Sequence, residues 1–186
     1  AARPFSTHHN ALNISLYLRV APELYLKRLL VGGMRRVFEI NRSFRNEGIS
    51  KQHNPEFTMI EVYEAFGDCE TMLELTEGMV RSAATVVGDA SAIGFGDLTI
   101  DYTSSFDRIS YGELFENALG IPMSDETAVR STAKENGIDE ADTLNHWLLV
   151  DVLFGSKVEA TIDPSRPTFV TDFPSAISPL TRPHND

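Results

Sequence analysis

The sequence has 186 residues, of which 42% are hydrophobic and 23% are charged, a balance typical of a globular protein large enough for one sizeable core. Its net charge of −11 excludes a protein that holds nucleic acid mainly through a broad basic surface. The densest apolar run, Trp147–Val150, is far shorter than the ~20 residues that cross a bilayer, so we expect no membrane-spanning helix.

Positive charge is concentrated at the start of the sequence. Residues 1–66 contain nine Lys/Arg and six Asp/Glu, whereas residues 67–186 contain seven and 21. Two interpretations fit this distribution: chance surface composition, and a local site for a compact polyanion such as a nucleoside triphosphate.

The ends of the sequence and its single cysteine bear on cellular location and on whether the sequence is part of a longer protein. No apolar stretch follows the opening residues, Ala1-Ala2-Arg3-Pro4, so we expect no secretory signal. At the other end, the sequence finishes shortly after a strand-like run. We therefore expect an internal segment of a longer protein. Cys69 cannot form an internal disulfide, which fits a cytoplasmic location.

The first ninety residues predict a strand, a helix and a long hairpin. Apolar and polar residues alternate over 14–20, which is typical of a half-buried strand. A helix is predicted to start at Pro22 and to end at Gly32. Two further strands, 37–45 and 55–66, flank a polar loop and predict an antiparallel hairpin, and a helix is expected over 68–87.

The rest of the sequence is mostly helical by its periodicity. Ser110 and Glu113 have the spacing of a capping box and predict a helix that ends at Gly120. The remaining predicted elements are a short strand pair over 93–102, helices over 124–136 and 139–158, and a strand over 168–173. The predicted fold class is α+β, with antiparallel strands first, helices next, and a strand that returns to the sheet.

One face of the strand at 55–66 has the composition of a binding site. Because side chains alternate along a strand, Phe57, Met59, Glu61 and Tyr63 share a face. A carboxylate and a phenol make a poor apolar core, since a buried Glu61 costs several kcal/mol unless it is paired. A solvated face is the alternative interpretation of this pattern.

Two runs around the hairpin loop closely resemble motif 2 of the class II aminoacyl-tRNA synthetases. They are residues 38–48, Phe-Glu-Ile-Asn-Arg-Ser-Phe-Arg-Asn-Glu-Gly, and residues 53–61, His-Asn-Pro-Glu-Phe-Thr-Met-Ile-Glu. The Phe-Arg-x-Glu core and the His-Asn-Pro-Glu-Phe-Thr run are typical of the lysyl, aspartyl and asparaginyl subgroup.

Further segments are similar to the lysine enzymes of bacterial type within that subgroup. They are residues 7–12, 18–28 and 61–63, and residues 172–180 resemble the strand after the helical insertion of these enzymes. The resemblance is dense over 1–77 and 168–180 and rests on order and length across 89–165. It implies a partial catalytic domain over 1–186, with a motif 2 core (1–88), a mostly helical insertion (105–165) and a returning strand (168–180).

The resemblance also implies the roles of individual residues toward ATP. Arg45 would be the catalytic residue, holding the α-phosphate of ATP together with the carboxylate of the amino acid. The other ATP-binding positions are Asn46 and Glu47 beside the adenine, His53 and Asn54 near the phosphates, and Phe57 under the adenine ring.

The lysine-binding positions implied by the resemblance are Glu23, Glu61 and Tyr63, together with Arg45. Lysine carries two ammonium groups, so a selective pocket needs carboxylates and a polar acceptor at different depths. Uncharged analogues would leave those carboxylates unpaired and would be rejected.

Several parts of a complete enzyme are expected to lie outside this sequence. By the resemblance these are motif 1, which builds much of a homodimer interface, motif 3 with a second ATP-binding arginine, the Mg²⁺ ligands, and the anticodon-binding OB-fold domain that reads tRNA(Lys). We predict no metal site within the sequence, since the adjacent His8 and His9 would point to opposite faces of a strand. The segment is expected to be inactive alone.

Two other functions are compatible with the same motifs. The first is the ligase that attaches lysine to elongation factor P, which has a similar motif 2 and no anticodon domain. The long helical region at 110–165 and the Glu61-Val62-Tyr63 context favour the synthetase. The second is a non-catalytic interaction module derived from a synthetase, which would have no need to keep Arg45, Glu47 and His53 together.

Overall fold

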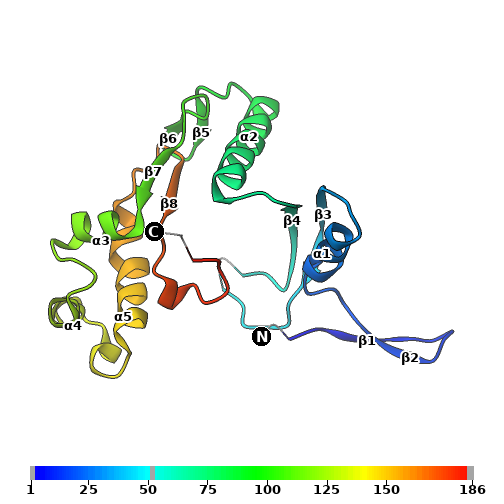
Figure 1. Cartoon of the computed structure of the whole chain (residues 1–186), viewed down its shortest axis with the longest axis horizontal. Helices are drawn as coiled ribbons and strands as arrows, with labels where there is room; N and C mark the ends of the chain where they lie inside the picture. The colour runs from blue at the N-terminus through cyan, green and yellow to red at the C-terminus, as the bar shows by residue number, and fades with distance from the viewer. Residues whose placement is uncertain (1–2, 51–52, 184–186) are drawn as a thin grey trace. The chain divides into compact units, whose positions relative to one another are not determined.

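The computed structural model describes residues 3–50 and 53–183 of the chain. The chain divides into two compact units, residues 1–69 and 70–186, and both contain helices and strands (Figure 1). The described strands form two-stranded sheets, most of them antiparallel, which confirms the predicted α+β class. Within the described residues no helix is both long enough and apolar enough to cross a membrane.

The first unit begins with a ribbon of two short strands. β1 (Ser6–His9) pairs antiparallel with β2 (Ile14–Tyr17), and every residue of both strands is exposed. The alternating pattern at 14–20 therefore predicts the strand but not its environment, since Leu16 is 40% exposed and Tyr17 is 67% exposed. The expected half-burial is wrong because this two-stranded ribbon presents both of its faces to solvent.

A helix and a long hairpin complete the first unit. α1 (Glu23–Val31) follows Pro22 and ends at Gly32 and Gly33, and Gly33 has the left-handed φ of 101° that a glycine adopts freely. β3 (Arg36–Phe44) and β4 (Glu56–Glu64) pair antiparallel along their whole length, from Arg36 opposite Glu64 to Phe44 opposite Glu56. The predicted helix and the predicted hairpin are both confirmed.

α2 (Cys69–Val87) begins at the last residue of the first unit and otherwise belongs to the second. A short hairpin of β5 (Ile93–Phe95) and β6 (Leu98–Ile100) follows it. β7 (Asp107–Ser110) comes next and is not predicted from the sequence. It pairs in parallel with β8 (Thr168–Thr171). The strand expected over 168–173 is thus present, but its partner is β7 rather than the antiparallel hairpin. The long helical crossover between β7 and β8 is what a parallel pair requires.

The helices of the crossover begin at polar caps. Ser110 Oγ accepts a hydrogen bond from the Glu113 backbone N–H at 3.1 Å, and Gly120, with φ 71°, ends the helix as predicted. The single helix expected over 139–158 is wrong, because the Asn145 side chain caps a new helix at Leu148 N. The elements are α3 (Tyr111–Leu119), α4 (Glu126–Glu135), η1 (Asp139–Asp142), α5 (His146–Leu153), the π-turn η2 (Phe154–Val158), and the 3-10 turns η3 (Glu159–Thr161) and η4 (Ser175–Ile177).

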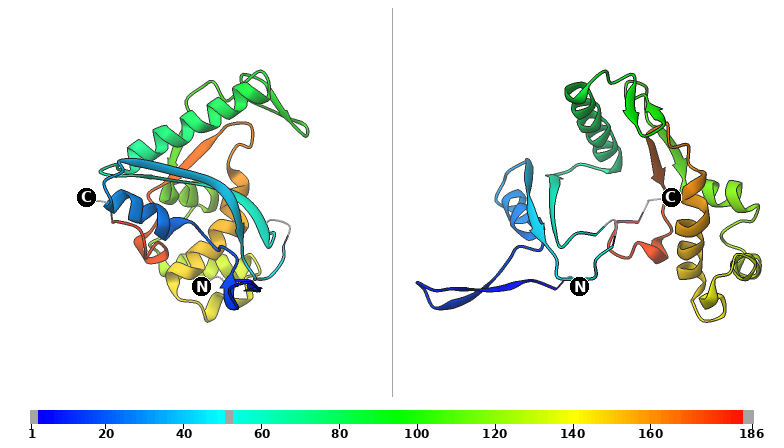
Figure 2. Two further views of the ribbon diagram at one scale, coloured as in Figure 1. Left: turned by 90° about the vertical axis from the view of Figure 1, so that its right-hand side faces the viewer. Right: turned by 180° about the vertical axis from the view of Figure 1, so that it is seen from behind.

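The hydrophobic core of the described chain lies in the second unit, among α3, α4, α5 and η2. The ribbons of these elements, green to orange, lie in one part of that unit in the right-hand view of Figure 2. Phe115, Val129 and Leu149 are 0% exposed. Tyr111 stacks on Phe154, with ring centroids 3.8 Å apart and planes 13° apart. Large apolar side chains from four elements therefore bury one another, which is the dominant favourable contribution to folding in a domain of this kind.

Candidate active site

The face of the β3–β4 hairpin that carries Glu61 is the candidate site. Phe57, Met59, Glu61 and Tyr63 are all partly buried, the intervening Thr58 and Ile60 are exposed, and Val62 is partly buried. All four residues lie in β4, whose alternation places them on one face as predicted. The register places Glu39 of β3 directly opposite Glu61. Side chains opposite each other on an antiparallel pair have Cβ atoms ~5 Å apart, so the two carboxylates are neighbours.

Tyr63 and Glu61 form a hydrogen-bonded pair on this face. The Tyr63 hydroxyl donates to Glu61 Oε2 at 2.6 Å. Burial, followed by the bond to Glu61 and the negative charges of Glu61 and Glu23, raises the pKa of Tyr63 well above its usual range. Tyr63 therefore remains a protonated donor, and Oε1 of Glu61 is available to a ligand that carries a positive charge.

Glu39 is neutralised by a network that the sequence analysis does not identify. Arg19 forms an ion pair with Glu39 Oε1, and Asn41 Nδ2 donates to the same oxygen at 2.7 Å. The hydrogen bonds from Asn41 and Arg19 lower the pKa of the Glu39 carboxyl. Of the two facing carboxylates, Glu39 is thus occupied, and Glu61 is the one without an ion-pair partner in the described chain.

α1 brings a third carboxylate to this face. Glu23, in the first turn of α1, pairs with the Lys27 ammonium at 2.5 Å. The same ammonium lies 5.9 Å from the centroid of the Tyr63 ring, which places α1 over the face that carries Tyr63. An ammonium group is therefore already held between Glu23 and Tyr63.

Arg45, just after β3, supplies the positive charge of the site. Its guanidinium lies 5.1 Å from the centroid of the Phe57 ring, and its backbone N–H donates to the Pro55 carbonyl at 2.8 Å. Arg45 Nε is buried without a hydrogen-bond partner, and within the described residues the side chain makes no ion pair. A stacked guanidinium with free donors is suited to a phosphate or a carboxylate.

The connection between β3 and β4 carries the remaining predicted residues. A hydrogen bond of 2.7 Å joins His53 Nδ1 to Ser50 Oγ, and two backbone bonds of 3.3 Å link the same residues. Glu47 and Asn54 are exposed, as is Asn46, whose backbone N–H donates to the Arg3 carbonyl at 2.8 Å. The structure brings Glu23, Arg45, Phe57, Glu61 and Tyr63 to one face and leaves the loop residues at its edge.

Comparison with known proteins identifies the family. The family described as "tRNA synthetases class II (D, K and N)" matches residues 1–186, the whole chain. This chain belongs to the class II tRNA synthetases. It is similar to the lysine–tRNA ligases of Staphylococcus aureus strains Mu3, MRSA252 and MW2, each 46% identical over 186 residues and 98% of the chain.

The class II synthetase chain spans about 37% of the length of these relatives. It is therefore a homologue of one part of a lysine–tRNA ligase. The matched part includes the hairpin with Arg45 and Glu61 and all of the helical region, because the similarity extends over nearly the whole chain.

The resemblance to class II synthetases implies that Mg²⁺ is used together with ATP. Acidic side chains are the usual protein ligands of Mg²⁺, so their arrangement in this chain matters. Residues 3–50 and 53–183 contain no group of three or more His, Cys, Asp or Glu side chains that could hold a metal ion. The carboxylates of the candidate site are instead arranged singly, Glu39 against Arg19 and Glu61 against Tyr63.

Proposed function

We propose that this chain is a part of a lysine–tRNA ligase that contributes residues for binding lysine and ATP to the formation of lysyl-adenylate by the complete enzyme. The observation that carries the proposal is the arrangement on one hairpin face. Arg45, with free donors, stacks on Phe57 at one end of the face, and the Glu61–Tyr63 pair lies further along β4. A lysine whose carboxylate lies near Arg45 can direct its side chain toward Glu61.

Lysine would be selected by charge at both of its amino groups. Glu61, oriented by Tyr63, would accept the side-chain ammonium, and Glu23 would accept the α-ammonium. The Lys27 ammonium, 2.5 Å from Glu23, supports the suitability of that position for a cation. Aspartate or asparagine would leave Glu61 unpaired, and an unpaired buried charge gives strong discrimination.

The reaction needs no general base from this chain. The lysine carboxylate is ionised at pH 7, and one of its oxygens attacks the α-phosphorus of ATP. The new C–O–P bond forms as the bond from the α-phosphorus to the bridging oxygen breaks, and pyrophosphate leaves with that oxygen and its electron pair. Arg45 would align the two anions and stabilise charge that develops on the α-phosphoryl oxygens.

Transfer to tRNA(Lys) completes the proposed activity. The adenylate carbonyl would be attacked by the terminal ribose hydroxyl of tRNA(Lys), releasing AMP. The net charge of −11 indicates that tRNA is held mainly by other parts of the enzyme. We propose that the complete enzyme acts in the cytoplasm as a homodimer and uses Mg²⁺ held by residues of those other parts.

A hybrid enzyme tests the proposal. This chain would replace the matching segment of the Staphylococcus aureus lysine–tRNA ligase, and lysine-dependent ATP–pyrophosphate exchange would be measured. Arg45→Ala is expected to lower the exchange by at least about 100-fold, the usual loss on removing a charge-stabilising donor. The matched control is Arg42→Ala, because Arg42 lies on the opposite face of the hairpin and pairs with Glu56 at 2.8 Å. Near-normal exchange by Arg45→Ala would refute the proposed role.

A further inference from the structure

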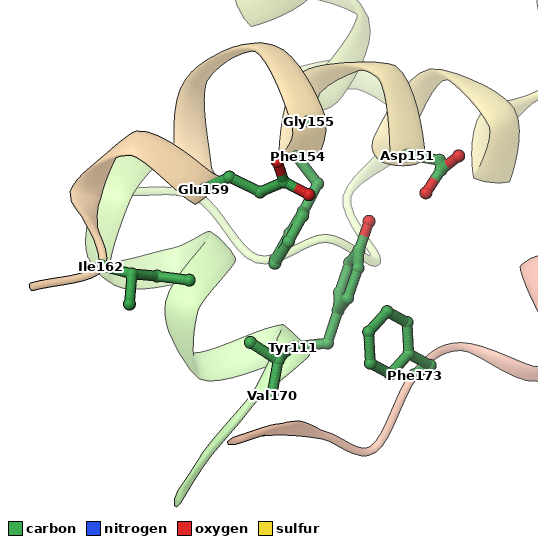
Figure 3. A pocket seen from close by; sticks show the side chains of 8 residues that line it. All are labelled: Tyr111, Asp151, Phe154, Gly155, Glu159, Ile162, Val170 and Phe173. Carbon is green, nitrogen blue, oxygen red and sulfur yellow. The ribbon is translucent and has the colours of Figure 1, made fainter. Parts of the chain in front are cut away.

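A hollow in the second unit uses none of the residues of the candidate active site. It has a volume of about 520 Å³ and is lined mainly by α3, α5, η2 and β8, with Tyr111, Asp151 and Glu159 as its polar residues (Figure 3). A volume of that size is within the range of small-molecule sites. Figure 3 shows the Tyr111 hydroxyl pointing between the carboxylates of Asp151 and Glu159.

Tyr111 is a fully buried phenol whose hydroxyl is unsatisfied. The residue is 0% exposed, and its hydroxyl has no hydrogen-bond partner in the described part of the chain. The ring is fixed by Phe154, stacked at 3.8 Å, and by Phe173, tilted at 5.1 Å. A buried polar group without a partner is rare in native structures and indicates a missing water, ion or ligand.

The two carboxylates at the hollow are also unpaired. Neither Asp151 nor Glu159 forms an ion pair with any residue of the ranges 3–50 and 53–183. Burial, followed by the negative charges of Asp151 and Glu159, raises the pKa of Tyr111. Both carboxylates are exposed at the edge of the hollow, and two negative charges beside one opening favour a positively charged occupant.

The apolar residues that line the hollow indicate which kind of cation fits it. Phe154, Phe173, Ile162 and Val170 present aromatic rings and hydrocarbon to the interior. A hard metal ion needs several oxygen ligands, and the described residues hold no cluster of three or more metal-binding side chains. An organic cation with a hydrocarbon part satisfies the carboxylates and the apolar walls together.

We propose that this hollow binds a small alkylammonium ion. Its ammonium group would donate hydrogen bonds to Asp151, Glu159 and the hydroxyl oxygen of Tyr111, and its alkyl chain would lie against Phe154 and Phe173. The inference does not depend on the lysine-activating function, because no residue of the hairpin contributes. Free lysine is a poorer occupant than a diamine, since its own carboxylate would face those of Asp151 and Glu159.

The test is a titration of the 186-residue chain, carrying Glu61→Gln to weaken cation binding at the hairpin, with 1,5-diaminopentane. The neutral analogue 1,5-pentanediol is the matched ligand. Calorimetry measures affinity, and the methyl resonances of Ile162 and Val170 report the position of binding. We expect saturable binding of the diamine that shifts these methyl signals, and none of the diol.

Variants separate the proposed site from general attraction to an acidic chain. Tyr111→Phe and Asp151→Asn are each expected to raise the Kd of the diamine by about tenfold, which corresponds to one lost hydrogen bond to a charged group. Asp97→Asn, an exposed acid of the same unit, should leave the Kd unchanged. Tyr111→Phe removes only an unpartnered hydroxyl, so this variant is expected to fold even if Asp151→Asn does not.

Three results would overturn the inference. The first is equal binding of diamine and diol, the second is an equal effect of Asp97→Asn and Asp151→Asn, and the third is the absence of saturable binding by a folded chain with dispersed amide resonances.

Discussion

Replacing Tyr63 by phenylalanine isolates the contribution of one hydroxyl to lysine recognition. The hydroxyl donates to Glu61 Oε2 at 2.6 Å and so holds the carboxylate in one orientation. Without it Glu61 keeps its charge but gains rotational freedom. The variant therefore tests whether Glu61 is pre-organised for an ammonium ion.

The size of the effect follows from the conformational cost of ordering one side chain. Immobilising a flexible side chain on binding costs roughly 0.5–1.5 kcal/mol. Taking about 1 kcal/mol, Tyr63→Phe is expected to weaken binding of a lysyl ligand about fivefold. Glu61→Gln removes the charge itself and is expected to cost about 1.5–3 kcal/mol, as for a hydrogen bond to a charged group.

The assay is calorimetric titration of the hybrid enzyme with non-hydrolysable lysyl- and norleucyl-adenylate analogues, since norleucine keeps the alkyl chain and lacks the terminal ammonium. Tyr63→Phe should weaken only the lysyl ligand. In the Glu61→Gln background the same change should have little effect, giving a coupling energy of about 1 kcal/mol. The control is Tyr25→Phe, on the exposed side of α1 (66% exposed). Equal losses for both ligands, or fully additive effects of the two changes, would refute the reasoning.

Three further changes test the second unit of the chain. Phe115→Ala, at a 0% exposed position, should lower the free energy of unfolding by about 3–5 kcal/mol in urea titrations, whereas Phe95→Ala, at 73% exposure, should change it by less than about 0.5 kcal/mol. Asn145→Ala removes the cap of α5 and should cost about 1 kcal/mol, seen as faster amide exchange in its first turn. Hydrogen bonds, first of all from Ser104, lower the pKa of Asp101 below its ordinary 3.8; Asp101→Asn should therefore be less stable than the original chain at pH 7, and the difference should shrink as the pH falls below about 4.

The elements predictable from sequence are those specified by nearby residues. The β3–β4 hairpin has alternating strands on both sides of one loop, and α1 has Pro22 at its start and Gly32 at its end. The break at 145 was also locally encoded, since Asn145 is a strong N-cap residue placed three positions before Leu148. The prediction of one helix over 139–158 rests on helical periodicity, which does not register a cap residue within the run.

The features that could not be predicted depend on residues far apart in the chain. β7 and β8 pair across about 60 residues; the sequence predicts β8 but not the four-residue β7, and so it cannot predict their parallel pairing. The exposure of the β1–β2 ribbon depends on what packs against it, which alternation does not encode. The partner of Glu39 is Arg19, 20 residues earlier, whereas the position of Glu39 opposite Glu61 follows from the hairpin register once its ends are known.

The central claim is that the hairpin face of this chain selects and activates lysine. It is tested most directly by the amino-acid dependence of ATP–pyrophosphate exchange in the hybrid enzyme. Lysine, aspartate and asparagine are compared, because the matching family is described by the letters D, K and N. We predict exchange with lysine alone, and its loss in Glu61→Gln. A folded hybrid that exchanges equally with aspartate, or that keeps full lysine-dependent exchange without the Glu61 carboxylate, would contradict the account.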